Sequence, residues 1–280
     1  MSTSIAVRRE SKGSEIMIST PGLSTVACVV ITKNEEANIQ DCLRSAQWAN
    51  ELIVVDAESC DKTVELAHAC GAKVFVRPWP GFGLQKNFGM AQASSDWILI
   101  LDADERVTEE LREDIKACLA GWTSGDPVAY RIPRRNFFYG AWVSGGGVYP
   151  DYQVRLFRRG IAQYNDVAVH ENLIVEGAIG TLAGHLDHYT ERRIRDHFKK
   201  FGLYTTMAAQ EKAKTVRTVN WIDLVLRPLV ILVKTYVLKQ GYGDGVRGLI
   251  VCVFASMYTF VKYAKLWDAT RQAPSHPDAR

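Results

Sequence analysis

The chain has 280 residues, of which 47% are hydrophobic and 23% charged, as in a globular protein with one large domain or one domain and an extension. Residues 192–280 carry 16 Lys and Arg against 6 Asp and Glu, a net of +10, so the overall +3 hides a net of −7 in the preceding residues. The acidic first part argues against nucleic acid as a partner. The basic, apolar end suits an anionic surface, with a membrane as the leading candidate.

The six cysteines contain no Cys-x-x-Cys pair, and several occur in apolar segments. We therefore expect buried thiols rather than disulfides or a zinc site, as in a reducing compartment. The first twenty residues lack the apolar core of a secretory signal, and residues 1–23 are expected to form a disordered tail.

Apolar runs alternate with helical patterns from residue 26 to residue 101. The near-continuous apolar run at 26–32 predicts a strand that is buried on both faces of a parallel sheet. Further strands are expected at 52–56, 73–76 and 97–101, and helices at 37–47, 62–70 and 84–93. This alternation predicts an α/β domain with a mostly parallel sheet flanked by helices.

Polar residues stand at the carboxyl ends of three of these strands, namely Thr32, Asp56 and Asp102. Ligands of parallel sheets bind beyond the carboxyl ends of the strands, so we expect the three residues to face one crevice. The alternative for Asp56 is that it only caps a turn.

The strand at 97–101 is followed at once by Asp102-Ala103-Asp104-Glu105. Two carboxylates on either side of a small alanine can be aimed at one point by a turn. Mg²⁺ usually takes one or two carboxylates and completes its shell with water and substrate phosphate. The stretch therefore suggests a metal–diphosphate site, although an Asp-x-Asp motif alone is a weak signal.

Four motifs follow one another along the chain: Val-Ile-Thr-Lys-Asn-Glu-Glu (30–36), Val-Val-Asp-Ala-Glu-Ser-Cys-Asp-Lys-Thr (54–63), Gln-Lys-Asn (85–87) and Leu-Asp-Ala-Asp-Glu (101–105). In this order they resemble the family-2 glycosyltransferases, and more narrowly the bacterial lipopolysaccharide-core β-1,4-glucosyltransferases. The resemblance covers residues 25–189, and residues 204–267 also look like the carboxy-terminal part of that subgroup.

The resemblance implies a GT-A fold, a nucleoside-diphosphate sugar donor and a divalent metal, Mg²⁺ or Mn²⁺. It also implies roles for six residues: Thr32 and Glu35 along the base and ribose, Asp56 on the uracil or ribose side, Lys86 near the nucleotide or diphosphate, Asp102 near the ribose or metal, and Asp104 as metal ligand. A metal and a lysine would neutralise the charge of the diphosphate leaving group. The alternative for Lys86 is a solvated lysine on a helix surface.

An inverting transfer needs a base for the proton of the acceptor hydroxyl. Family-2 enzymes typically carry a Glu-Asp pair where this chain has His170-Glu171, and by position we assign Glu171 as the base. Asp151 and Asp166 compete for this role.

The acceptor side is expected between residues 128 and 159. Strands are predicted at 128–133 and 153–157, and between them a loop that is rich in aromatic residues and glycine. Its aromatic rings are suited equally to stacking on sugars and to core packing. Further along the chain, His185 and His188 could ligate a metal, but a structural role is favoured for them because no third ligand is evident.

Residues 193–280 are expected to form a helical, basic and apolar region beyond a catalytic domain at 24–192. Two apolar segments, 221–238 and 248–261, are too short or too interrupted for typical membrane spans. We predict that they lie on or dip into the inner leaflet of the membrane, with Lys, Tyr and Trp at the headgroups. The alternative is a soluble oligomer interface, so a homo-oligomer stays open.

The sequence thus predicts a metal-dependent, inverting family-2 glycosyltransferase at the cytoplasmic face of the inner membrane. It would move glucose, or a close relative, from a UDP-sugar to a lipopolysaccharide-core or other lipid-linked saccharide. Two alternatives stay open: a nucleotidyltransferase, for which no Gly-rich basic signature follows the first strand, and a non-catalytic membrane scaffold that binds nucleotide sugars.

Overall fold

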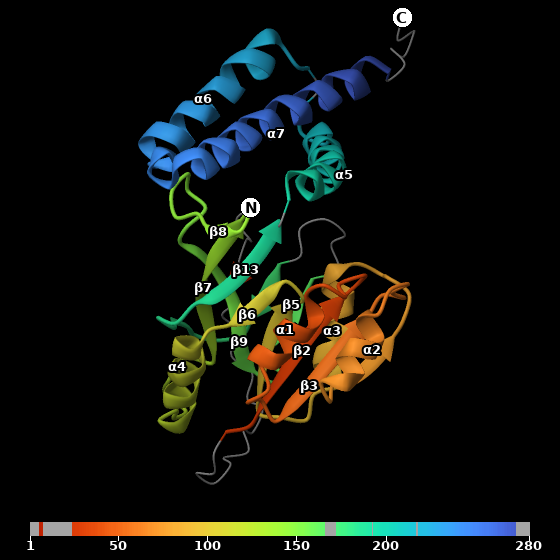
Figure 1. The fold of residues 1–280 in the computed structure, drawn as a ribbon, viewed down its shortest axis with the longest axis vertical. Coiled ribbons are helices and arrows are strands. Elements are labelled where there is room, and N and C mark those ends of the chain that lie inside the picture. Colours follow the sequence, from red (N-terminus) through yellow and green to blue (C-terminus); the bar gives the residue numbers. More distant parts are fainter. Residues whose placement is uncertain (1–5, 8–23, 166–171, 192, 217, 273–280) are drawn as a thin grey trace, which may run out of the picture. The chain divides into compact units, whose positions relative to one another are not determined.

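A computed structural model describes residues 6–7, 24–165, 172–191, 193–216 and 218–272 (Figure 1). The chain divides into two compact units, one of residues 1–135 with 151–188 and the other of residues 136–150 with 189–280. The second unit therefore contains not only the C-terminal helices but also the segment 136–150, which the sequence places within the catalytic domain.

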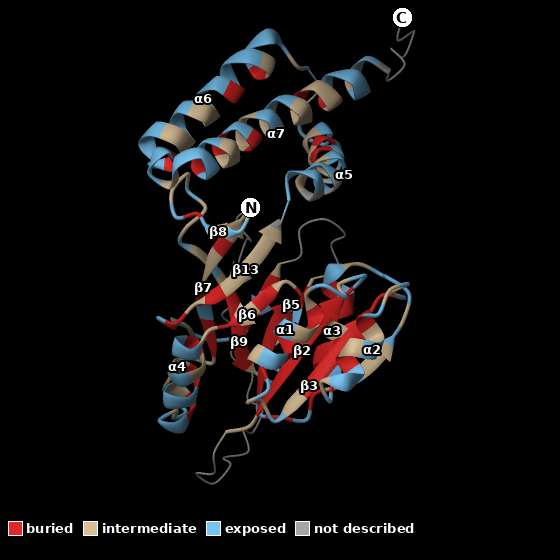
Figure 2. Ribbon diagram, viewed as in Figure 1, coloured by how far each residue is buried: buried red, intermediate tan, exposed pale blue. Residues whose placement is uncertain are grey.

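Four parallel strands form the centre of the first unit. Their order in the sheet is β4 (Lys73–Val76), β3 (Glu51–Asp56), β2 (Val26–Thr32) and β5 (Trp97–Asp102). All seven residues of β2 are buried, as are the first five of β5, as Figure 2 shows by colour. Strands covered on both faces need such continuous apolar runs, and the predicted α/β class is confirmed.

Each face of this sheet has its own core because alternate residues of a strand point to opposite faces. On one face, Cys28 and Val30 of β2 pack in a cluster with residues of α1 (Ile39–Ser45), α2 (Thr63–Ala69) and α4 (Glu109–Ala120). On the other face, Val29 and Ile31 pack with residues of α3 (Phe82–Ala91) and of the strand pair β10 (Ala162–Tyr164) and β11 (Leu173–Val175). These helices hold the strand ends in fixed positions.

Further strands, mostly antiparallel, extend the sheet beyond β5. The order continues with β9 (Asp151–Arg158), β7 (Ala129–Phe138), β13 (Leu186–Glu191) and β6 (Glu105–Val107), while β8 (Ala141–Trp142) and β12 (Ile179–Thr181) pair with β7. A separate small sheet joins β1 (Ala6–Val7) to β11 and β10. The predicted strand at 128–133 is longer than expected and the loop after it shorter, since β7 continues to Phe138 and its end pairs with β8, where Phe137 lies opposite Trp142.

The second unit consists mainly of helices. α5 (Ile194–Ala213) is followed by a helical stretch in which π-helical turns, η1 (Ile222–Leu226) and η2 (Lys234–Leu238), flank α6 (Arg227–Val233). Pro228 lies within this continuous helical stretch, directly after η1, and lacks the N–H that would bond to the preceding turn. After the 3₁₀ turn η3 (Gly241–Asp244), α7 (Gly245–Gln272) is twice as long as the predicted helix at 248–261.

Among the described residues, one helical segment, Gly241–Arg271, is long and apolar enough to cross a membrane, judged by length and composition alone. Only 22% of its most apolar window is buried. The predicted C-terminal apolar helices are therefore present, and α7 leaves much of its surface uncovered.

All six cysteines are free thiols. Cys28, Cys42 and Cys252 are buried, whereas Cys60 is exposed. Burial raises the pKa of Cys28 to about 12, so this thiol stays neutral and behaves as a small apolar side chain.

Candidate active site

The ends of three neighbouring strands bring Thr32, Asp56 and Asp102 to one edge of the sheet. Thr32 lies directly opposite Asp56 in the register of β2 with β3, and Ile31 lies opposite Asp102 in that of β2 with β5. Thr32 and Asp56 are buried, while the side chain of Asp102 is 32% exposed. The structure therefore places these residues side by side, as expected for the crevice of a parallel sheet.

Asp56 is turned toward its own loop. Its Oδ2 accepts a hydrogen bond from the backbone N–H of Ser59 at 2.8 Å, and its Oδ1 accepts one from the Ser59 hydroxyl at 2.5 Å. Asp56 thus caps the turn after β3. In the described part of the chain, the buried hydroxyl of Thr32 has no hydrogen-bond partner, so it is the more available polar group of the two.

The loops that follow β2 and β3 are fastened to each other. Asn34, with a left-handed φ of 54°, accepts a hydrogen bond from the Cys60 N–H at 2.8 Å through Oδ1. The N–H of Glu35 donates to the Thr63 hydroxyl at 2.8 Å, and the Glu35 carboxylate accepts from the Asn38 side chain at 2.7 Å. Glu35 therefore lies within the rim of the crevice, held at both its backbone and its side chain.

Lys86 is buried on α3 with only 3% of its surface exposed. Its Nζ lies 3.4 Å from Asp102 Oδ1 and 5.2 Å from the centre of the Tyr164 ring. This position contradicts the alternative of a solvated surface lysine. The positive charge is held at the strand end that carries the Asp102-Ala-Asp104 motif.

A chain of buried charges of alternating sign continues from Asp102 into the protein. Arg155 Nη2 lies 2.5 Å from Asp102 Oδ2 and 2.5 Å from Glu105 Oε1. Arg134 donates to Glu105 at 2.9 Å and to Asp151 at 2.5 Å. The fully buried Glu105 also accepts the backbone N–H of Asp102 at 3.0 Å, so it fixes the turn that begins there.

These partners favour the charged forms of Asp102 and Arg155. Burial tends to raise the pKa of Asp102, but Arg155 and Lys86 outweigh it and hold that pKa well below its usual range. Burial likewise tends to lower the pKa of Arg155, and Asp102 and Glu105 raise it well above its usual value. Both oxygens of Asp102 are therefore engaged by cations.

Asp104 faces in a different direction, toward His188. Its Oδ2 lies 3.5 Å from His188 Nε2, and both side chains are partly exposed. The pairing of β13 with β6 brings His188 there, opposite Glu105 in the register. Because Asp102 is engaged by cations, Asp104 is the better placed of the two carboxylates to hold a metal.

A divalent ion fits this pair of donors. One carboxylate and one imidazole leave most of a metal's coordination shell to water and phosphate oxygens, as is usual for Mg²⁺ and its relatives. The described residues contain no group of three or more metal-ligating side chains. Water and the phosphate oxygens of a bound substrate would therefore have to supply the other ligands of such an ion.

His185 does not join His188 in this arrangement. It lines a shallow surface depression with Glu110, Glu113 and Asp114. Burial and then the charge of Arg135 lower the pKa of His185, which favours a neutral ring. The two histidines therefore have separate surroundings.

The assigned base, Glu171, lies outside the described residues, as do His170 and Asp166. Its competitor Asp151 is described and accepts hydrogen bonds from Arg134 at 2.5 and 2.9 Å. A carboxylate held by a guanidinium in this way is a poor proton acceptor, so the structure disfavours Asp151.

Sequence reasoning missed Arg155 and Arg134 as parts of the site. A signal was present: Arg155 stands in the middle of the apolar strand segment Val154–Phe157, where an unpaired charge would be costly. What the sequence could not supply was the partner, since β9 pairs antiparallel with β5.

Comparisons with known proteins agree with this geometry. Residues 27–159 match the family model "Glycosyl transferase family 2". The chain is 28% identical over 263 residues to the lipopolysaccharide core biosynthesis glycosyltransferase LpsC of Rhizobium meliloti, covering 91% of this chain and 97% of that protein. It is also 28% identical over 254 residues to an uncharacterized glycosyltransferase of Rickettsia typhi, covering 87% of each.

Among solved structures, the chain is similar to the mannosyltransferase PcManGT from Pyrobaculum calidifontis in complex with GDP-Man and Mn²⁺. The TM-score is 0.52 with 14% sequence identity, covering 92% of this chain and 91% of that one. At this identity the likeness is one of fold.

Proposed function

Because residues 27–159 match the model of glycosyl transferase family 2 and the fold is that of a GT-A enzyme, we propose that the chain is an inverting family-2 enzyme of lipid-linked saccharide synthesis. It transfers a hexose, glucose or a close relative, from a UDP-sugar to a lipopolysaccharide-core or other lipid-linked acceptor. The observation that carries this proposal is the convergence of Thr32, Asp102 and the buried Lys86 at one sheet edge, with Asp104 beside them. The similarity to LpsC, a lipopolysaccharide core biosynthesis glycosyltransferase, supports the choice of acceptor.

The donor lies along the strand ends in this proposal. Thr32, Glu35 and Asp56 line the side of the base and ribose, and Asp102 contacts the ribose. Lys86 is positioned to attract the diphosphate, and its burial strengthens that attraction because little water screens the charge. A divalent metal, Mg²⁺ or Mn²⁺, held by Asp104 with His188, and with Asp102 as a further predicted ligand, would neutralise negative charge on the leaving diphosphate.

The acceptor hydroxyl attacks the anomeric carbon of the sugar while the bond to the diphosphate breaks. Glu171 takes the proton of that hydroxyl, which makes the oxygen a stronger nucleophile. The configuration at the anomeric carbon is inverted because a single displacement takes place.

In this proposal the enzyme is peripheral at the cytoplasmic face of the inner membrane, and the second unit makes the contact. Its net charge of +10 over residues 192–280 and the apolar surface of α7 both favour an anionic bilayer. A peripheral position of this kind gives access to an acceptor that is itself anchored in lipid.

The direct test is a screen of nucleotide sugars with purified truncated lipopolysaccharide cores, measuring release of the nucleoside diphosphate. We expect UDP release from one UDP-sugar that depends on one core acceptor. Binding of UDP-sugars without release, even with the native acceptor, would instead support a non-catalytic binder.

Asp104→Asn tests the metal site. We expect at least about a hundredfold loss of transfer rate, since several kcal/mol of charge stabilisation in the transition state would be removed. Asp41→Asn is the control, because Asp41 is 61% exposed and its ion pair is with Arg106, 3.7 Å away, rather than with Asp102 or Asp104. A normal rate of the Asp104 variant with added Mg²⁺ or Mn²⁺ contradicts the assignment.

Glu171→Gln tests the base. The amide has the same shape but cannot take a proton, so calorimetry should show unchanged UDP-sugar binding while turnover falls by about 10²–10⁴-fold. Near-normal turnover would remove Glu171 from this role.

A further inference from the structure

The helical stretch around α6 leaves one apolar stripe uncovered. Its members recur every three or four residues and are each 47–54% exposed: Leu226, Leu229, Val230, Val233 and Val237. This spacing puts them on one side of a helix. Large exposed apolar surfaces of this kind mark contact with another molecule or with a membrane.

α7 carries a second stripe with the same periodicity. Its members are 36–73% exposed: Val246, Leu249, Val253, Met257 and Phe260. α6 and α7 are neighbours in the second unit and form a helical hairpin (Figure 2). We call the two stripes together the apolar face of the hairpin.

Both ends of α7 are attached to other parts of the second unit. At its start, the N–H of Gly145 donates to Asp244 Oδ2 at 2.6 Å, and the N–H of Gly146 donates to the Lys239 carbonyl at 2.8 Å. Near its other end, Lys265 Nζ donates to the Gly202 carbonyl of α5 at 2.8 Å. Because polar segments hold both ends, the hairpin would lie along a bilayer surface with its face in contact rather than insert into the bilayer tip first.

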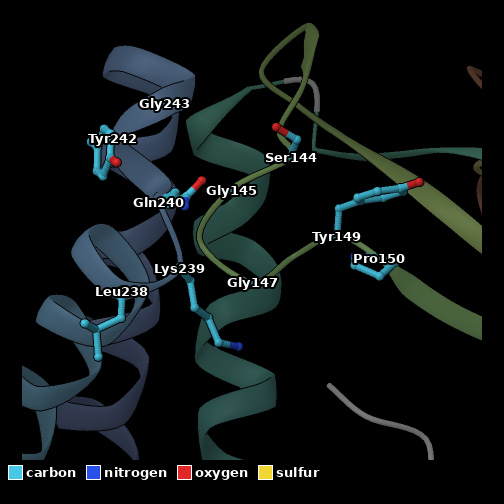
Figure 3. Close-up of a pocket in the computed structure, with 10 residues that line it drawn as sticks. All are labelled: Ser144, Gly145, Gly147, Tyr149, Pro150, Leu238, Lys239, Gln240, Tyr242 and Gly243. Atoms are coloured by element: carbon cyan, nitrogen blue, oxygen red, sulfur yellow. The ribbon is translucent and has the colours of Figure 1, made fainter.

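A pocket of about 610 Å³ lies where the loop 144–150 meets the turn of the hairpin, shown in Figure 3. Lys239, Gln240 and Tyr242 line it from the hairpin, and Ser144 and Tyr149 from the loop. Leu238 directly follows the last member of the α6 stripe, is 73% exposed and directly precedes Lys239. The exposed apolar surface is therefore adjacent to the pocket that Lys239 lines.

The Lys239 side chain lies across the loop. A Cβ on Gly147 would clash with the end of the Lys239 side chain, so the lysine occupies the space that the glycine leaves open. In the described part of the chain, no carboxylate lies within ion-pair distance of Lys239. Asp244, an acidic group in the same turn, is already engaged by the N–H groups of Ser144 and Gly145.

Charge decides between the two occupants that an apolar face could have. A second copy of the chain would bring two regions of net charge +10 together, which is unfavourable. An anionic bilayer offers hydrocarbon to the apolar face and phosphates to the lysines.

We propose that the apolar face lies in the surface of an anionic phospholipid bilayer, and that the pocket at Lys239 binds the phosphate of one phospholipid headgroup. This proposal depends on the proposed function in one respect only, namely that the bilayer is the inner membrane. Binding of the headgroup would fix one point of the hairpin at the bilayer surface. Contact between the apolar face and the lipid would then set the plane in which the hairpin lies.

Flotation of the full-length protein with vesicles tests the proposal. The probes are vesicles of phosphatidylcholine alone and vesicles that also contain phosphatidylglycerol. We expect binding to the mixed vesicles and much weaker binding to the neutral ones. Lys239→Gln should weaken binding to the mixed vesicles by about fivefold, and Lys239→Arg should retain it.

The matched control is Lys234→Gln, which removes the same charge from the same hairpin but outside the pocket. A smaller effect of this control than of Lys239→Gln supports the pocket, and equal effects overturn it in favour of diffuse attraction. Val233→Ser should reduce binding to both kinds of vesicle. If it instead dissociates a dimer in solution, the occupant is a second copy and the proposal fails.

Two further readouts keep the outcomes separate. Calorimetry of UDP-sugar binding on each variant shows whether the first unit is intact, so loss of flotation with normal donor binding bears on the membrane contact alone. Binding that requires the glycolipid acceptor in the vesicles would assign the pocket to the acceptor and overturn the phospholipid assignment.

Discussion

Arg155 links the turn after β5 to the interior of the protein. Its guanidinium joins two carboxylates, Asp102 at the strand end and Glu105 in the core, each at 2.5 Å. Lys86 also holds the Asp102 carboxylate, but it lies farther away at 3.4 Å. We infer that Arg155 is a positioning residue that aims the Asp102 carboxylate.

Arg155→Met should destabilise the protein strongly. The substitution leaves Glu105 buried with one cation fewer, and breaking a buried pair in this way costs about 3–5 kcal/mol. Urea denaturation measures the change in the free energy of unfolding. The control Arg112→Met removes an ion pair with Glu113 in which both side chains are about one-third exposed or more, and should cost about 0–1 kcal/mol.

The loss of stability caused by Arg155→Met should depend on pH. An unfolded aspartate has a pKa of about 3.9, and the folded pKa of Asp102 is lower, so its ionised form stabilises the folded state above about pH 4. This contribution is lost as the pH falls below that value. The difference in unfolding free energy between the natural chain and Arg155→Met should therefore shrink from about pH 6 toward about pH 3. A constant difference would show that the Asp102 pair contributes nothing to stability.

α3 must lie close to the sheet to bury Lys86, and Gly89 makes this possible. A Cβ at Gly89 would lie 2.5 Å from Val29 Cγ1 and 2.9 Å from Val55 Cγ2. Gly89→Ala should therefore destabilise the chain by about 1–3 kcal/mol, despite the better helix propensity of alanine. Thermal unfolding measures this.

Gly202 in α5 is the matched control, because a Cβ added there would meet no other atom within 4 Å and its φ is ordinary. Gly202→Ala should stabilise the chain by about 0.5–1 kcal/mol. Equal effects of the two substitutions would mean that α3 can move away from β2 at little cost.

The elements that the sequence predicted best are those with continuous apolar runs. The strands β2 and β5 could be predicted without knowing which strands lie beside them, because a strand that is covered on both faces has few polar residues. α4 was missed although Thr108 caps it and Glu109 and Glu110 follow, a local start signal that was available. The long β7 could not be foreseen, since its second half depends on pairing with β8.

The positions of the candidate site residues could be predicted only where these residues lie on the parallel strands of the sheet. The positions of Thr32, Asp56 and Asp102 at adjacent strand ends follow from chain order and the crevice rule. Arg155 and His188 come from strands that join the sheet antiparallel and from far along the chain. Such partners are decided by strand order, which no local pattern in this sequence reveals.

At the scale of the whole molecule, charge is divided between the two ends of the chain. Residues 192–280 carry a net of +10, and the residues before them carry a net of −7. An anionic membrane attracts the positively charged residues 192–280 and repels the negatively charged residues before them. The electric field of the membrane therefore favours an orientation in which the C-terminal helices contact the lipid. Without this division, a lipid surface would concentrate the enzyme without orienting it.

Salt should therefore inhibit transfer to a membrane-borne acceptor more than transfer to a soluble one. The screening length falls from about 10 Å at 0.1 M salt to about 3 Å at 1 M, which removes the attraction of the lysines and arginines for the bilayer. We expect transfer to lipopolysaccharide cores in anionic vesicles to fall steeply over this range. Transfer to a lipid-free core oligosaccharide should change much less, because the charges around Asp102 and Lys86 are partly or fully buried. Equal inhibition with both acceptors would show that salt acts on the crevice itself, and that electrostatic attraction to the membrane does not limit the enzyme.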